Sequence, residues 1–236
     1  FARMPKPIFR QNNLVDLINE KILVTGKGKV ARGAMEVLDF LKIKKINKND
    51  FLCKEFNYPV YCNIDILDYY KRKDNGVFNK QEFYEKPFLY NCVLKDFIKI
   101  PSIFIAGHFH NSEAGVLLNN NDFINSNLKV VSDISCDIGF IACTLRESTI
   151  LDPIYGYNYN KSIEVDYSLN DSILVIAVSN LPCELPLDSS IDFGRTFIDK
   201  IFPLLLNNDK NIINATICKD GKLTKKYIYL RDFLLR

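Results

Sequence analysis

The sequence has no apolar segment long enough to cross a membrane, although 47% of its 236 residues are hydrophobic. A spanning helix needs roughly 20 consecutive apolar residues, and the longest tight apolar cluster here is Phe202–Leu206. A surplus of one charge is also absent, because 31 Lys and Arg stand against 28 Asp and Glu. That balance argues against a dedicated nucleic-acid binder. We therefore expect neither membrane nor nucleic acid as a partner.

Several motifs of covalent and metal chemistry are missing as well. The seven cysteines are odd in number, scattered, and form no Cys-x-x-Cys pair, which fits a reducing compartment and a cytoplasmic location better than a disulfide framework. There is no Gly-x-Ser-x-Gly elbow and no Walker loop.

The first residues carry no apolar core of the kind that a secretory signal needs. Their basic, acid-poor character is compatible with a transit peptide. We prefer to interpret residues 1–20 as a linker from an absent upstream domain, so that the chain is either a fragment or a truncated gene product.

What the sequence does contain is a series of short apolar runs that end in small or polar residues. Ile22–Thr25 stops at Gly26, and apolar residues from Gly33 onward then follow a helical spacing. Another short strand is expected around residues 45–47, and three later runs cover residues 103–106, 129–131 and 173–178. This order predicts an α/β fold, a doubly wound parallel sheet of Rossmann-like type whose ligand crevice lies at the carboxyl ends of the strands.

The same pass along the chain divides it into parts. Residues 21–182 are expected to form one domain built on this sheet, with an aromatic and polar excursion at 48–100 that forms either a solvated cover with short helices or a partner-binding surface. Residues 183–236 are expected to be a C-terminal helical segment, with a helix over Ser189–Leu206 and a turn at Asp220–Gly221.

The most informative motif is a glycine turn between the first strand and the first helix. Gly26-Lys27-Gly28-Lys29-Val30-Ala31 matches the pattern G-x-G-x-x-[G/A]. In that pattern the first glycine permits the tight turn, the second lets the backbone approach a pyrophosphate, and a small third residue lets helix and strand pack closely. The motif therefore predicts that the domain of residues 21–182 binds a dinucleotide, and a purely structural turn is the alternative.

An acidic residue that holds the adenosine ribose is expected about 20 positions after the glycines. Asp50 is the candidate, and it favours NAD. Lysines at 44, 45 and 48 lie next to it and could instead accommodate the 2′-phosphate of NADP.

Other residues with chemical potential cluster near the expected strand ends. His108 and His110, with Glu113 nearby, could hold a metal, but two histidines that line the crevice are the better reading, and no metal is expected. Cys136 and Cys183 are interpreted as small buried thiols rather than nucleophiles. Asp133 and Asp137 either stabilise a turn or contact a ribose or a substrate ammonium group.

Taken in order, several segments resemble the NAD-binding half of the lysine-forming saccharopine dehydrogenases, within the wider alanine dehydrogenase and transhydrogenase group. The likeness rests on the glycine turn through Gly33, on Val131–Ile138 and on Val178–Pro186. Tyr155–Asn158 and Ile217–Thr224 resemble a bacterial branch of that family. The resemblance covers residues 20–236.

The resemblance implies roles for individual residues. Gly28 and Lys29 would meet the pyrophosphate, and Asp50 the adenosine ribose. Phe109 would flank the adenosine, and Ile134 would also line the cofactor pocket. The nicotinamide end would lie beside Val178, Ser179, Asn180 and Leu181, and the amino-acid substrate would face Ser135, Cys136 and Asp137.

The implied activity is NAD-dependent cleavage of saccharopine to L-lysine and 2-oxoglutarate, with the active site between two domains. The family's catalytic lysine and histidine belong to its N-terminal domain, so no catalytic residue is assigned here and a missing domain or partner chain would supply them. Ser179 stands where the family usually carries aspartate, and Glu113 where we expect arginine. The alternatives are an alanine dehydrogenase-like enzyme and a non-catalytic dinucleotide-binding module.

Overall fold

A computed structural model describes residues 19–169 and 171–233 of the chain. The linker expected at residues 1–20 therefore lies almost wholly outside the described residues. The chain divides into two units, with the boundary between Asn180 and Leu181, and each is treated by itself below.

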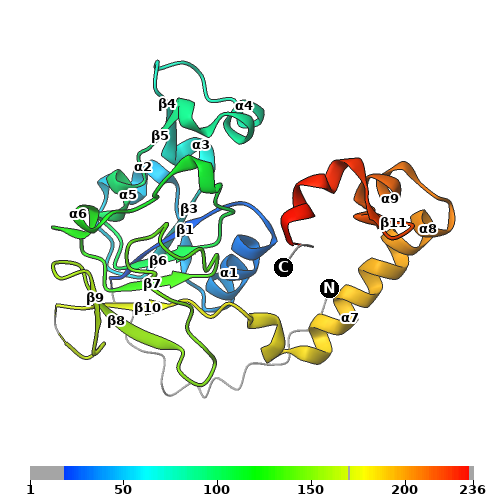
Figure 1. Cartoon of the computed structure of the whole chain (residues 1–236). Helices are drawn as coiled ribbons and strands as arrows, with labels where there is room; N and C mark the ends of the chain where they lie inside the picture. The colour runs from blue at the N-terminus through cyan, green and yellow to red at the C-terminus, as the bar shows by residue number, and fades with distance from the viewer. Residues whose placement is uncertain (1–18, 170, 234–236) are drawn as a thin grey trace. The chain divides into compact units, whose positions relative to one another are not determined.

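The first unit is built on an eight-stranded sheet with the order β2-β3-β1-β6-β7-β10-β8-β9 (Figure 1). The first six strands in that order run parallel, and β8 and β9 add an antiparallel edge. The bounds are β1 Lys21–Thr25, β2 Lys44–Lys45, β3 Val60–Ile64, β6 Ile103–Ala106, β7 Val130–Asp133, β8 Ile154–Asn158, β9 Ile163–Val165 and β10 Ile173–Ile176. The predicted Rossmann-like α/β class is confirmed.

Both faces of this sheet are packed. Alternate residues of a strand point to opposite faces, and in β1 Leu23 joins one hydrophobic cluster while Ile22 and Val24 join another. The second cluster is closed by α1, and the first by several short helices. The helices of this unit are α1 Lys29–Phe40, α2 Lys48–Cys53, α3 Ile66–Tyr69, α4 Lys80–Glu85, α5 Lys95–Ile98 and α6 Asn120–Phe123, with 3-10 turns η1 Pro87–Leu89 and η2 Ser112–Ala114.

Helix α1 begins earlier than the apolar spacing suggested. Lys29 is its first residue, and its buried positions are Ala31 and Leu38. Val37, which the spacing placed on the core face, is 42% exposed.

The excursion predicted at 48–100 is wrong in one important respect. Its residues 60–64 form β3, which pairs along its whole length with β1 and separates β1 from β2. β2 is only two residues long and lies at the sheet edge, so the strand beside β1 is β3 and not the segment around 45–47. The remainder of the excursion includes a small antiparallel hairpin, β4 Tyr70–Arg72 with β5 Tyr90–Cys92.

The second unit, described from Leu181 to Phe233, is mainly helical. Its elements are η3 Leu181–Glu184, α7 Pro186–Thr196, the π-helical η4 Phe197–Ile201, α8 Phe202–Leu206, α9 Lys210–Ala215, the hairpin β11 Cys218–Lys219 with β12 Lys222–Leu223, and η5 Lys225–Phe233. The expected helix over 189–206 is thus present, but it begins at Pro186, where a proline suits the first helical turn. The turn at Asp220–Gly221 is confirmed, and both residues have positive φ.

Candidate functional site

The glycine turn joins β1 to α1 with two glycines that serve different purposes. Gly26 has φ +97°, and a Cβ atom there would lie 2.6 Å from the carbonyl oxygen of Gly107. Gly28 has an ordinary φ of −74°, and nothing lies within 4 Å of the position that its Cβ would take. The fold therefore requires a glycine at 26, whereas at 28 the missing side chain leaves open space.

Helix α1 starts without the usual neutralisation of its first N–H groups. Gly28 is the N-cap, no side chain caps the helix, and its first turn has no acidic residue. The free N–H groups and partial positive charge of such a helix end attract anions, phosphate in particular.

The end of β6 packs directly against this helix start. A Cβ atom at Gly107 would lie 3.1 Å from the Cα of Ala31 and 3.2 Å from its Cβ. The small third residue of the turn is thus needed for close packing of α1 on the neighbouring strand end, which is the role that the pattern assigns to it.

A cavity of about 280 Å³ lies beside the turn. It brings together segments far apart in the sequence, and its lining residues are Gly26, Lys27, Gly28, Asp65, Ile66, Tyr69, Lys80, Tyr84, Gly107, His108 and Phe109. Of the residues predicted to bind the cofactor, Gly26, Gly28 and Phe109 meet here. Lys29 and Val30 are exposed in the first turn of α1, and Ala31 is buried beneath it.

Asp50 does not lie in this cavity. It belongs to α2, where its carboxylate accepts hydrogen bonds from Lys54 and Asn47, and the hydrogen bond from Lys54 lowers the pKa of the carboxyl. Asp65 lines the cavity instead, directly after β3, with its Oδ2 3.6 Å from Lys27 Nζ. This placement follows from strand order, because β3 and not the segment around 45–47 lies beside β1, so the residue after β3 comes next to the glycine turn.

Sequence reasoning missed Asp65 because it missed β3. The run Val60-Tyr61-Cys62-Asn63-Ile64 carries the β-branched and aromatic residues typical of a strand and ends in an acid. Asp65, the acid that follows this run, lies further from the glycines than the expected spacing of about 20 residues, so the spacing pointed to Asp50 instead.

His108 is buried below the cavity and shares a 2.6 Å hydrogen bond between its Nδ1 and the hydroxyl of Thr25. Its ring also contacts that of Tyr69, at 6.1 Å between centroids. Burial lowers the pKa of His108 to about 4, so the imidazole is neutral at pH 7. Because the N-terminus of α1 already carries a partial positive charge, a neutral imidazole adds no further positive charge to the site.

At the end of β7, Asp133 organises the following loop. Its buried carboxylate accepts hydrogen bonds from Ser135 Oγ at 2.6 Å, Thr144 Oγ1 at 2.7 Å and the backbone N–H of Cys136 at 3.2 Å. Of the two interpretations of this acid, the turn-stabilising one describes these contacts.

The three residues expected to face the substrate follow Asp133 and are all half-buried. The hydroxyl of Ser135 is used by Asp133, and burial raises the pKa of the Cys136 thiol to about 11, which makes it a poor nucleophile. Burial also raises the pKa of Asp137. Ile134, which was expected in the cofactor pocket, is half-buried. Its backbone N–H donates a hydrogen bond to the carbonyl oxygen of Ala106 in β6.

His110 lies near this loop. Its ring contacts that of Phe140 in a tilted arrangement, with the centroids 4.0 Å apart. Burial lowers its pKa, and its Nε2 has no hydrogen-bond partner among the described residues. In the described part of the chain no three His, Cys, Asp or Glu side chains are grouped as a metal site would require.

After β10 the chain leaves the sheet. Val178 is buried, whereas Ser179 and Asn180 are exposed, and Leu181 begins the second unit. Cys183, interpreted from sequence as a buried thiol, is exposed, because η3 buries none of its residues.

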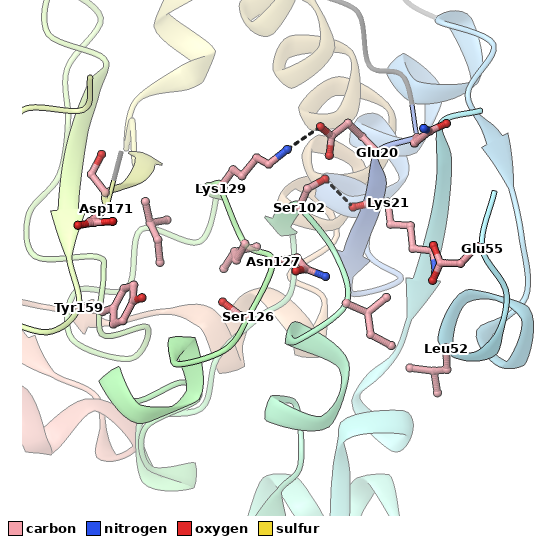
Figure 2. A pocket seen from close by; sticks show the side chains of 15 residues that line it. Glu20, Lys21, Leu52, Glu55, Ser102, Ser126, Asn127, Lys129, Tyr159 and Asp171 are labelled. Atoms are coloured by element: carbon pink, nitrogen blue, oxygen red, sulfur yellow. Dashed lines mark hydrogen bonds and ion pairs between the residues drawn. The ribbon is translucent and has the colours of Figure 1, made fainter. Parts of the chain in front are cut away.

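A second cavity, of about 700 Å³, lies at the opposite edge of the sheet, where the strands begin (Figure 2). Lys21 lies in its wall and donates hydrogen bonds to the carbonyls of Lys54 at 2.6 Å and Phe51 at 3.3 Å, which closes the C-terminus of α2. Glu20 and Lys129 form an ion pair across it at 2.9 Å. These contacts hold elements together, and ligands of parallel sheets bind at the other edge.

No helix in the described part of the chain combines the length and hydrophobicity of a membrane span. No model of a known protein family matches the sequence.

Comparison with known proteins finds relatives that are several times longer than this chain. It is 28% identical over 235 residues to alpha-aminoadipic semialdehyde synthase of Arabidopsis thaliana, a match that covers 87% of this chain and 22% of that protein. Mitochondrial alpha-aminoadipic semialdehyde synthases of Mus musculus and Bos taurus are 23% and 24% identical over 246 residues, covering 88% of this chain and 26% of each relative. The chain thus spans about a quarter of the length of these relatives. The chain is therefore similar to part of these synthases, and the similarity does not support the bacterial branch expected from the sequence.

Proposed function

We propose that this chain is the dinucleotide-binding part of an NAD-dependent oxidoreductase of lysine metabolism. One observation carries the binding proposal: Gly28 is a glycine that the fold does not require, at the uncapped start of α1 and in the wall of a cavity. A bound pyrophosphate explains the missing side chain, because it would occupy the space that a Cβ would enter.

The residues of the cavity fit the two ends of an adenosine diphosphate unit. The N–H groups at the start of α1 hold the pyrophosphate, and the Asp65 carboxylate accepts hydrogen bonds from ribose hydroxyls. Asp65 therefore takes the part first given to Asp50, and it favours NAD over NADP. Phe109, which is 76% exposed beside the cavity, offers an apolar surface to the nucleotide.

The reaction that we propose converts saccharopine, NAD and water into L-lysine, 2-oxoglutarate and NADH, with NAD accepting the hydride. Ser135, Cys136 and Asp137 would face the substrate, and Ile134 and Val178–Leu181 the nicotinamide end. The acid–base groups for imine hydrolysis would come from a domain outside this chain, which the greater length of the relatives supports. We also propose a cytoplasmic, reducing location, because all seven cysteines are unpaired.

A titration of the purified chain with NADH tests the binding step. We expect saturable binding, and we expect Gly28→Val to weaken it at least tenfold while the variant stays folded, because nothing in the protein lies within 4 Å of the position that a Cβ would take. Gly33→Val is the matched control, since Gly33 also has open space around it but lies outside the cavity. Equal binding by the Gly28→Val variant, or no binding by the folded wild type, would refute the proposal.

A further inference from the structure

The segment that follows Asp65 has no part in the expected dinucleotide fold, yet two of its helices reach the cavity. We call residues 66–92 the insert; it contains α3, β4, α4, η1 and β5, and these elements lie together at one end of the first unit (Figure 1). Four of the eleven residues that line the cavity belong to it: Ile66, Tyr69, Lys80 and Tyr84.

The insert is firmly tied to the sheet at its base. Asp65 and Asp68 form a reciprocal capping box that starts α3 immediately after β3. Tyr69, at the end of α3, is 1% exposed and contacts the ring of buried His108. The insert therefore leaves the sheet at the acid and passes directly under the cavity.

Helix α4 is held in one rotation about its axis. Phe83 is 2% exposed and packs on Tyr70 and Tyr90, with ring centroids 4.5 and 5.4 Å apart. Its neighbour Glu82 accepts a 2.6 Å hydrogen bond from the Tyr90 hydroxyl and pairs with Arg72. These contacts come from both strands of the hairpin, so α4 cannot turn without breaking a buried cluster.

With Phe83 facing inward, Lys80 and Tyr84 are presented to the cavity. Residues four apart lie on the same side of a helix, and both side chains line the cavity together with Asp65 and Gly26. Tyr84 is 44% exposed, and Lys80 makes no ion pair with any described residue. An exposed aromatic ring can stack on a nucleotide base, and a lysine without an ion pair can bind a phosphate.

We infer that the insert forms the outer wall of the adenosine site, with Tyr84 stacking on the adenine and Lys80 binding at the 2′ position of the ribose. This inference rests on the proposed dinucleotide function. The cavity of about 280 Å³ is at the small end of the range for bound ligands, roughly 300–1,000 Å³, and it suits one nucleoside better than a whole dinucleotide.

The charges give Lys80 a definite consequence for specificity. Asp65 alone would repel the 2′-phosphate of NADP, but Lys27 lies 3.6 Å from that carboxylate and Lys80 lines the same cavity. Two lysines against one acid allow a 2′-phosphate to be tolerated. We therefore expect the chain to accept NADPH beside NADH, which Asp65 favours, and we expect Lys80 to contribute to NADPH binding alone.

Titration with 5′-ADP and 2′,5′-ADP tests both roles, because these probes carry the adenosine half alone. We expect Tyr84→Ala to weaken both probes about tenfold, in keeping with the loss of one base–aromatic stack. We expect Lys80→Gln to weaken 2′,5′-ADP about tenfold and 5′-ADP less than twofold, in keeping with the loss of one charged hydrogen bond.

Matched controls lie in the same insert but outside the cavity. Phe88 is 62% exposed and Lys86 is exposed, so Phe88→Ala and Lys86→Gln should bind both probes as the wild type does. Circular dichroism melting of each variant shows whether it is folded.

The outcomes separate this inference from the proposed function. If the wild type binds and Gly28→Val does not, but Tyr84→Ala and Lys80→Gln bind both probes normally, the insert is not the adenosine wall and only the present inference fails. If the folded wild type binds none of the nucleotides, the proposed function fails first.

Discussion

At the scale of single residues, burial decides which ionisable groups of the site can carry charge. His108 sits on the hydroxyl of Thr25 and is 9% exposed, and desolvation holds its pKa near 4. The carboxyl of Asp137 is shifted in the opposite direction, since burial raises its pKa. Both shifts have the same cause, because burial disfavours the charged form of each group, which is the protonated histidine and the ionised carboxylate.

The lowered pKa of His108 predicts a pH-dependent stability. Between pH 6.5 and about 4 the unfolded histidine binds a proton and the folded His108 does not. Acid therefore favours the unfolded chain, and the free energy of unfolding falls as the pH falls through this window. We expect His108 to account for a loss of about 2 kcal/mol between pH 7.5 and pH 5.

Urea unfolding at several pH values measures this loss. The control is His108→Gln, which lacks the titrating ring, so its free energy of unfolding should depend less steeply on pH over the same range. Parallel pH profiles for the two proteins would show that His108 is not the group responsible.

At the scale of elements, the site depends on two turns that touch. The turn after β1 and the turn after β6 approach so closely that Gly26 would place a Cβ 2.6 Å from the oxygen of Gly107, and Gly107 would place one 3.1 Å from Ala31. Neighbouring parallel strands bring their carboxyl ends together, and small residues at these three positions allow the helix to sit on top.

Gly26→Ala should therefore destabilise the fold. The residue has φ +97° as well as a contact with the Gly107 backbone, which cannot move as a flexible side chain would. We expect a loss of about 2 kcal/mol or more in the free energy of unfolding, measured by urea denaturation. Gly28→Ala is the comparison, and it should cost about 1 kcal/mol or less, which is the range for a less favourable N-cap residue. Equal losses in the two variants would contradict the distinction between the glycines.

Strand β3 shows how an element escapes sequence analysis. The segments at 103–106, 129–131 and 173–178 were recognised because each contains an uninterrupted apolar run followed by small or polar residues, and they include β6, part of β7, and β10. In β3 the apolar residues are interrupted by Asn63, whose side chain donates hydrogen bonds to the carbonyls of Val24 and Gly26. Because this polar residue interrupts the apolar pattern, the strand was not predicted, although it lies in the interior of the sheet.

At the scale of the whole molecule, the described hydrophobic core belongs entirely to the first unit. Every buried hydrophobic residue in the described part of the chain lies between Ile22 and Val178. In the second unit α7, α8, α9 and η5 bury none of their residues. We therefore expect the sheet unit to fold without residues 181–236.

A chain that ends at Asn180 tests this expectation. It should unfold cooperatively, with the same midpoint as the full chain, and should retain NADH binding, because the cavity draws on no residue beyond Phe109. A chain that ends at Ile150 is the control: it lacks β8, β9 and β10 and should not fold. Loss of cooperative unfolding in the chain that ends at Asn180 would show that the helical unit completes the core.

The sequence by itself determined the local features of this protein. The strand, glycine turn and helix over residues 21–40 follow from a short apolar run, from glycines where the backbone needs them, and from helical spacing. These are properties of neighbouring residues, so a local pattern carries them. Gly26, Gly28, Ala31 and Phe109 could be chosen on that basis or from the resemblance, and the structure places them at one edge of the sheet.

The tertiary structure alone decided which distant segments complete the site. β1 pairs on one side with residues 60–64 and on the other with residues 103–106, and that choice brings Asp65 to the glycine turn and leaves Asp50 on α2. It also folds the insert back so that Lys80 and Tyr84 reach the cavity. Strand pairing and the burial of Phe83 depend on contacts between residues that are far apart in the sequence, so they cannot be predicted from a local pattern of residues.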